Sequence, residues 1–183
     1  DSGLILPPRV APYQVVIVPI PRGNWQETVL PKAREIQQAL TAQSVRVMLD
    51  DRDAYTPGWK FAEWELRGVP VRLEIGPKDI EKSQVVLARR DTREKSSAAM
   101  DGLITHVVAL LDEIQKSLFQ RALKFREEHT TRVSSYEEFK TVMEGRPGFV
   151  IAQWCGSADC EAQIKADTQA TLRNIPFGSE TGA

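Results

Sequence analysis

The chain has 183 residues, of which 42% are hydrophobic and 27% charged, and its formal net charge is −1 at pH 7. This length suits one large domain or two small ones, and the near-zero charge excludes a chain-wide basic field for nucleic acid. No apolar run reaches the ~18 residues that a membrane-spanning helix needs, and no signal peptide opens the chain. Two cysteines do not make a disulfide framework, so we expect a reducing compartment, the cytoplasm.

Strand and helix patterns alternate after an extended, proline-rich stretch at residues 1–12. Residues 13–20, YQVVIVPI, form a near-continuous apolar run, which is typical of a strand buried on both faces. Helical spacing of apolar residues follows at residues 29–40, with Thr28 as the expected N-cap. Residues 45–49 form the next expected strand. A strand, a helix and a strand in this order predict a parallel, right-handed connection.

A second helix is expected to begin at Thr56 and Pro57, which stand in the favoured order of N-cap and first helical residue. Three apolar residues of this helix, spaced by three and four positions, share one face: Trp59, Ala62 and Leu66. We expect this face to contact the hydrophobic core.

Residues 69–75 alternate, so that the apolar side chains point one way while Arg72 and Glu74 point the other. Residues 83–89 return as a strand, which we expect to be antiparallel because the connection is short. A long helical pattern then runs over residues 97–128.

A second unit is expected from Ser135, where a capping-box pattern with Glu138 precedes a short helix. Residues 149–154 and 171–177 are expected to form its strands, and a helix is expected between them at residues 161–167.

The polar groups of residues 50–91 stand at the joints between the expected elements, and RNA is one candidate ligand for them. A carboxylate accepts from the N1–H and the 2-amino group of guanine, whereas Arg and Lys donate to its O6 and N7. An aromatic ring stacks on a base that has left its helix. A glutamate, an arginine, a lysine and an aspartate beside an aromatic ring therefore suit guanines in a single-stranded loop.

Motifs of catalysis are absent from the sequence. No G-x-G-x-x-G and no P-loop follows the first expected strand, and there is no G-x-S-x-G or histidine-rich metal motif. The two histidines, His106 and His129, fall in the long helical pattern, where a surface role is the ordinary one. The sequence makes no case for catalysis by this chain.

Cys155 and Cys160 form a C-x4-C pattern on an expected turn between a strand and a helix. Such a pair is half of a tetrahedral zinc site. Two free thiols, a zinc half-site whose partners lie beyond Ala183 and a thiol enzyme all stay open as interpretations, the last being weakest because the spacing is not C-x-x-C.

Several segments resemble class II prolyl-tRNA synthetases of the archaeal/eukaryotic-like type. Segments similar to their anticodon-binding domain are LPPRVAPYQVVIVPI, DDRDAYTPGWKFAEWELRGVPVRLEIGPKD and VVLARRD. Segments similar to their additional C-terminal domain are RALKFREEHT, YEEF and WCGSADCEAQIKADTQATLRNIPF. The resemblance implies an α/β fold: a mixed, mainly parallel sheet of about five strands flanked by helices, the class IIa anticodon-binding fold, and then a small α/β domain of zinc type. It divides the chain into a linker at 1–12, an anticodon-binding domain at 13–130 and the C-terminal domain at 131–183.

The resemblance also implies what the first domain reads. Proline codons begin with two cytidines, so the cognate anticodon carries two adjacent guanines. The residues that read these guanines in the family match Glu65, Arg72, Lys78 and Asp79, with Phe61 as an aromatic contact.

The family's catalytic domain, which uses ATP and Mg to form prolyl-adenylate, is expected before residue 1, and both ends are expected to be cuts in a longer protein. The expected partners are proline tRNA, the chain's own catalytic domain and a second subunit of a homodimeric full-length enzyme, with no membrane and no DNA. This fragment is expected to hold no cofactor. The family's second cysteine pair is absent, with Asn174 at one of its positions, so zinc stays open for the longer chain. The alternative function is a stand-alone protein-interaction or regulatory module with the same fold.

Overall fold

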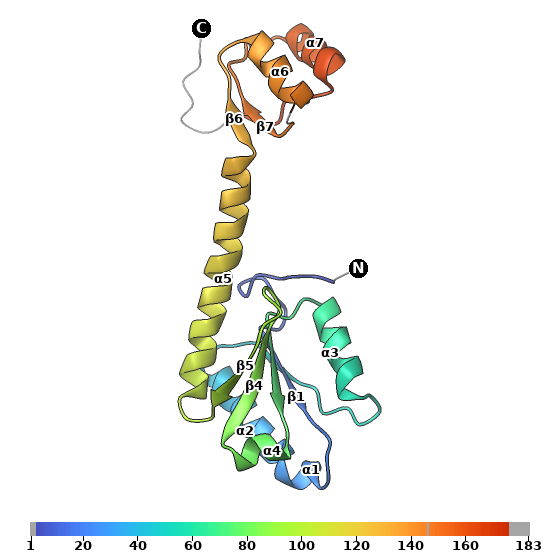
Figure 1. Ribbon diagram of the computed structural model, residues 1–183, viewed down its shortest axis with the longest axis vertical. Coiled ribbons are helices and arrows are strands. Elements are labelled where there is room, and N and C mark those ends of the chain that lie inside the picture. The colour runs from blue at the N-terminus through green and yellow to red at the C-terminus, as the bar shows by residue number, and fades with distance from the viewer. Residues whose placement is uncertain (1–2, 146, 176–183) are drawn as a thin grey trace. The chain divides into compact units, whose positions relative to one another are not determined.

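The computed structural model of the chain describes residues 3–145 and 147–175 (Figure 1). The chain divides into two compact units, Asp1–Gln120 and Arg121–Ala183, and the boundary falls within the long helix α5 (Leu103–Glu128). The domain boundaries expected from the sequence stay a prediction.

The first unit contains a five-stranded sheet in the order β2-β1-β3-β4-β5. Its strands are β1 (Val15–Pro19), β2 (Val47–Leu49), β3 (Val71–Ile75), β4 (Gln84–Arg89) and β5 (Lys95–Ala99). β1 pairs in parallel with β2 and β3, whereas the β3–β4 and β4–β5 pairs are antiparallel. The expected mixed α/β sheet is confirmed, although parallel pairs equal antiparallel pairs in number and do not predominate.

Helices cover the two faces of this sheet unequally. The helices of the first unit are α1 (Trp25–Thr28), α2 (Leu30–Ala42), α3 (Pro57–Leu66), α4 (Pro77–Glu81) and the start of α5. α2 and α5 lie on one side of the sheet and α3 on the other (Figure 1). None of the helices in the described residues has the length and apolar character to cross a membrane.

The alternation of side chains along β1 explains why the core has two parts. Val15 and Ile17 join the large apolar cluster beneath α2 and α5, while Val16 and Val18 join a small cluster with Trp64 of α3. Because successive residues of a strand point to opposite faces, a strand that is buried on both sides reads as a continuous apolar run. α3 packs on β1. On the same face of the sheet, β3, β4 and β5 contribute no residue to the small apolar cluster.

A buried carboxylate at the end of β2 holds α3 on the sheet. The Asp50 side chain has no solvent exposure, and it accepts from Nε and Nη2 of Arg52, each at 2.8 Å, and from Nε1 of Trp64 at 2.7 Å. Nζ of Lys60 donates to the main-chain oxygen of Asp50 at 3.0 Å and lies 3.6 Å from its carboxylate. Two residues one helical turn apart, Lys60 and Trp64, are therefore drawn to the same buried group.

This network overturns the expected core face of α3. Trp59 and Leu66 are 44% and 60% exposed, whereas Lys60 and Trp64 are only 2% and 3% exposed. The apolar spacing of Trp59, Ala62 and Leu66 gave the wrong face, because the buried charge selects Lys60, which an apolar pattern treats as a surface residue.

The two expected N-caps differ in outcome. Trp59 N donates to Oγ1 of Thr56 at 3.3 Å, so the N-cap of α3 is confirmed. Thr28 is the last residue of α1, and its hydroxyl donates to the main-chain oxygen of Asn24 at 2.9 Å. The expectation that Thr28 caps a helix is therefore wrong.

The long helix begins later than expected, because β5 occupies part of the range 97–128. β5 consists of small polar and alanine residues without an apolar alternation, and its pairing with β4 makes it a strand. Gly102 has φ +69°, a left-handed conformation that glycine adopts at little cost, and α5 starts at the next residue.

The second unit contains β6 (Thr130–Arg132), α6 (Tyr136–Gly145), β7 (Phe149–Ile151) and α7 (Ala158–Thr168). β6 and β7 pair in parallel, and β6 was not predicted. Glu138 N donates to Oγ of Ser135 at 3.2 Å, as the capping-box pattern predicts, while the Glu138 carboxylate accepts from Ser134 N at 2.9 Å. The strand expected at 171–177 is wrong for residues 171–175, which have no regular structure, and residues 176 and 177 lie outside the described residues.

Replacing Asp50 by asparagine should lower the free energy of unfolding by about 3–5 kcal/mol, because Lys60 would lose its buried counter-charge. Burial alone raises the pKa of Asp50, but hydrogen bonds from Arg52 and Trp64 and the charge of Lys60 outweigh it and lower the pKa to about 2. The folded pKa is below the unfolded value of about 4, so this stabilisation is complete above pH ~4 and is lost as the pH falls towards 2. Urea unfolding of the wild-type chain and the Asp50→Asn variant, at neutral and at acidic pH, measures both effects.

The matched control is Asp51→Asn, since Asp51 is an exposed neighbour whose carboxylate lies 3.7 Å from Nη2 of Arg34. Its replacement should change the free energy of unfolding by less than about 1 kcal/mol. Equal losses for the two variants would contradict the role assigned to the buried carboxylate.

Candidate nucleic-acid interface

On the side of the sheet that faces α3, side chains of β3, β4 and β5 lie next to one another across the strands. The register places Arg72 beside Ala88, and Ala88 beside Lys95. Glu74 lies in the next row, beside Val86. Side chains two residues apart on a strand share a face, so Arg72 and Glu74 point to the side of the sheet on which α3 lies, as the alternation predicts.

Arg72 joins α3 to this face by bridging two carboxylates. Its Nη1 lies 2.6 Å from Oε1 of Glu65 on α3, and its Nε donates to Oε1 of Glu74 at 3.0 Å. Nζ of Lys95 lies 2.9 Å from the same oxygen of Glu74. The Arg72 side chain is only 7% exposed, whereas that of Glu65 is 51% exposed. The outer carboxylate of the pair is therefore open to solvent, and its cation lies beneath it.

Phe61 completes the group from the first half of α3. The guanidinium carbon of Arg72 lies 4.1 Å from the centre of the Phe61 ring, and Nζ of Lys95 lies 5.2 Å from it. Both distances fall within the ~6 Å range of cation–π attraction. The Phe61 ring thus lies against the two cations of this face.

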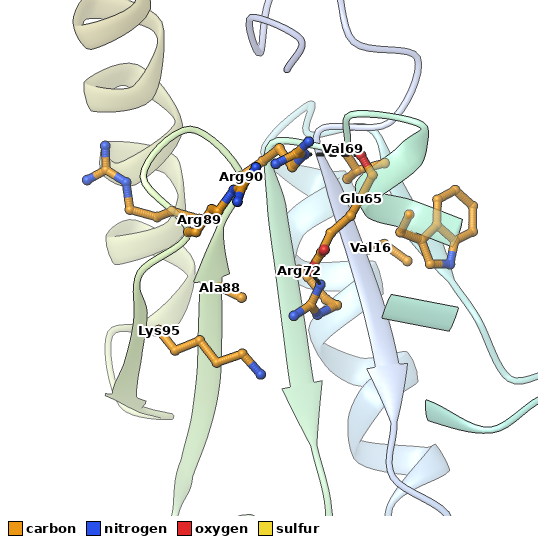
Figure 2. Close-up of a pocket in the computed structure, with 10 residues that line it drawn as sticks. Val16, Glu65, Val69, Arg72, Ala88, Arg89, Arg90 and Lys95 are labelled. Atoms are coloured by element: carbon orange, nitrogen blue, oxygen red, sulfur yellow. Dashed lines mark hydrogen bonds and ion pairs between the residues drawn. The ribbon is translucent and has the colours of Figure 1, made fainter. Parts of the chain in front are cut away.

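A cavity of about 80 Å³ opens between α3 and this face of the sheet (Figure 2). It is much smaller than the ~300–1,000 Å³ pockets of cofactors and drug-sized ligands. Five basic side chains and one carboxylate line it, above an apolar floor: Arg72, Arg89, Arg90, Arg93, Lys95 and Glu65, with Val16, Trp64, Val69 and Ala88. Such a cavity suits the edge of an inserted group better than a whole enclosed ligand.

Arg90 fixes the upper end of this cavity. Its Nε donates to the main-chain oxygen of Glu65 at 3.0 Å, and Figure 2 shows the two residues meeting at one end of the cavity. Arg89 points away, towards carboxylates: it pairs with Asp91 at 2.9 Å and with Glu113 at 2.5 Å. The hydrogen bonds that Arg89 donates to Asp91 and Glu113 raise the pKa of Arg89, so its charge is permanent but already neutralised.

The other two predicted residues lie on α4, beyond the C-terminal end of β3. The Asp79 carboxylate accepts from the main-chain N–H of Gly76 at 2.8 Å, which closes the first turn of α4, and Lys78 is exposed. Since a strand rises ~3.3 Å per residue, Gly76 lies ~13 Å along the chain from Arg72. The structure thus brings Phe61, Glu65 and Arg72 together and places Lys78 and Asp79 at a separate point.

Lys95 and Arg93 were missed by the sequence reasoning. Both line the cavity, and both belong to the β4–β5 hairpin. The sequence held no usable signal for them, because β5 was not predicted as a strand.

Cys155 and Cys160 are free and exposed, the first just before α7 and the second within it. A hydrogen bond between them lowers the pKa of Cys155 and raises the pKa of Cys160. A structural zinc ion takes four ligands, and the part of the chain that the structure describes holds no group of three or more His, Cys, Asp or Glu residues that could bind a metal ion. The described residues therefore do not fit a zinc site.

Two protein-family models match the chain. The model described as "Anticodon binding domain" matches residues 14–110, which is more than half of the chain. The model described as "Prolyl-tRNA synthetase, C-terminal" matches residues 136–183.

Curated relatives match nearly the whole chain. It is 52% identical to proline–tRNA ligase 2 of Clostridioides difficile (strain 630) over 182 residues, 98% of this chain and 37% of that protein. It is 50% identical to the proline–tRNA ligase of Amoebophilus asiaticus (strain 5a2), over 99% of this chain and 37% of the relative. It is 51% identical to the proline–tRNA ligase of Porphyromonas gingivalis (strain ATCC 33277), over 98% of this chain and 36% of the relative.

The chain spans little more than a third of the length of these relatives. Its first unit has the mixed sheet flanked by helices that the resemblance implies. The chain therefore belongs to the anticodon-binding domain family, in the form found in prolyl-tRNA synthetases.

Proposed function

We propose that the first unit recognises the two adjacent guanines of the proline anticodon. The observation that carries this proposal is the ion pair of Glu65 and Arg72, which places an acceptor and a donor at one cavity, with the aromatic ring of Phe61 against Arg72. Guanine is complementary to this set, since it presents the N1–H and 2-amino donors and the O6 and N7 acceptors.

Recognition on this proposal is an exchange of partners. In the free chain Glu65 and Arg72 satisfy each other. A bound guanine would donate to Glu65 and accept from Arg72, so that both charges keep a partner while the base stacks beside Phe61. Adenine presents a 6-amino donor in place of O6, which would set a donor against Nη1 of Arg72, while Nε of Arg72 keeps its bond to Glu74. On this proposal the cost of a donor left without an acceptor at the cavity rejects the wrong base.

The neighbouring guanine is assigned to α4. Lys78 is exposed and can donate to O6 and N7, and Asp79 can accept from the base in addition to its bond with Gly76 N. The separation between Arg72 and α4 along β3 supports two distinct base sites rather than one.

The wider function follows from the relatives, which are named proline–tRNA ligases. We propose that the protein containing this chain ligates proline to its tRNA with ATP and Mg in a separate catalytic domain, as a homodimer in the cytoplasm. This chain then supplies binding energy and specificity. Uniform binding energy lowers KM, whereas correct placement of the tRNA end contributes to kcat.

Arg72→Ala and Lys78→Ala should each weaken binding to an RNA hairpin with the proline anticodon by about 1–3 kcal/mol, because each removes donors to a guanine. Each variant should also lose preference for guanine over adenine at one of the two positions. Titration of the chain against the hairpin with two guanines and the two single-adenine hairpins measures both effects.

The control variant is Arg34→Ala, which removes an exposed cation from α2 on the opposite side of the sheet. It should not change the preference for guanine. If Arg72→Ala and Lys78→Ala weakened binding to all three hairpins equally, their contacts would be to phosphates and the base-reading proposal would fail.

A zinc site at Cys155 and Cys160 would need ligands that the described residues do not supply. Both thiols should therefore react with a thiol reagent in the folded chain, and added zinc should not protect them. Thiol titration with and without zinc, together with metal analysis of the purified chain, tests this. Stoichiometric zinc, with both thiols protected until a chelator is added, would contradict it.

A further inference from the structure

We propose that Arg93, in the turn between β4 and β5, binds a backbone phosphate of the RNA loop whose guanine lies against Glu65 and Arg72. This inference rests on the proposed function and adds to it a subsite for the sugar–phosphate chain. Its ligand is a phosphodiester of single-stranded RNA.

The backbone conformation of Arg93 is the first feature that supports this proposal. Its φ is +65°, in the left-handed region. The turn is closed by Arg93 N donating to the oxygen of Arg89 at 3.1 Å and by Arg89 N donating to the oxygen of Glu94 at 2.9 Å. Hairpin turns place Gly, Asn or Asp at left-handed positions, because a longer side chain is disfavoured there. An arginine kept in this conformation points to a role for its side chain.

The lack of a partner for the Arg93 charge is the second feature. Of the basic side chains that line the cavity, Arg72 and Lys95 share Glu74, and Arg89 pairs with two carboxylates. The Arg93 side chain is exposed, and it has no hydrogen bond or ion pair with residues 3–145 or 147–175. Its charge and all its side-chain donors are therefore available to a ligand. The planar fork of a guanidinium matches the oxygens of a phosphate.

The position of Arg93 is the third observation. It lines the same cavity as Glu65 and Arg72, and it also borders an open depression of about 940 Å³ over the outer face of α3. Trp59, Ala62 and Leu66 line that depression too. A nucleotide whose base reaches Arg72 through the cavity would leave its phosphate at the rim, where Arg93 lies. A free anion would need several converging donors, whereas a phosphate already tethered by its base needs one.

The discriminating variant is Arg93→Gly, since glycine suits the left-handed backbone while the cation is removed. The thermal midpoint should not fall, yet the affinity for the anticodon hairpin should drop about fivefold at ~0.1 M salt. The slope of log K against log salt concentration should become shallower by ~0.7, the value for one phosphate contact on a single strand. The loss should be equal whether the other guanine, the one assigned to α4, is kept or replaced by adenine, because a phosphate carries no sequence information.

Two controls sharpen this experiment. Arg93→Lys keeps the charge and should keep the salt slope, whereas Arg34→Ala should change neither affinity nor slope, because it lies on the other side of the sheet. Hairpins in which each loop phosphate in turn is an uncharged methylphosphonate locate the contact. One of these substitutions should abolish the difference between the wild-type chain and the Arg93→Gly variant.

Failure of this inference is distinguishable from failure of the proposed function. If the wild-type chain prefers guanine but Arg93→Gly changes neither affinity nor salt slope, the phosphate subsite is overturned and base reading stands. If the wild-type chain shows no preference for guanine, the proposed function is overturned, whatever the effect of Arg93→Gly on the salt slope.

Discussion

The buried carboxylate of Asp50 sets the rotation of α3 about its own axis, and the candidate site depends on that rotation. Lys60 and Trp64 both turn inward to Asp50. Phe61 and Glu65 follow them by one position each, which is about 100° around a helix. This angle brings both side chains to the edge of α3 that faces Arg72. A charge that stabilises the fold thus also fixes the geometry of the groups assigned to the base.

The same rotation leaves the apolar face of α3 exposed to solvent. The charged cavity lies beside that helix. In the free chain Arg72 is paired with Glu65 and Glu74, and Lys95 is paired with Glu74. A site closed in this way gives little affinity to a base that cannot replace both partners, because breaking one ion pair leaves a charge without a counterpart. On the proposed function, specificity for guanine would arise from what the wrong base fails to replace, and affinity from phosphate contacts that read no sequence.

The parts of the fold that the sequence predicts are those with strong local patterns. β1, β3 and β4 follow from continuous or alternating apolar residues, and Thr56 with Pro57 marks the start of α3. β5 could not be predicted, because its small polar residues form a strand only through pairing with β4. The face of α3 was wrong for a related reason. Lys60 is buried by a partner ten positions earlier in the chain, and apolar periodicity carries no information about such a contact.

The site divides in the same way. Phe61, Glu65 and Arg72 were predicted by resemblance and lie together, whereas Lys95 and Arg93 belong to the hairpin that was missed. The central claim is that Glu65 exchanges Arg72 for the donors of a guanine. Replacement of each anticodon guanine by inosine, which lacks the 2-amino group, tests it most directly when combined with Glu65→Gln in a double-mutant cycle. At one position inosine should weaken binding to the wild-type chain by about 1–2 kcal/mol and have little further effect in the variant. Equal losses in both chains at both positions would contradict the claim.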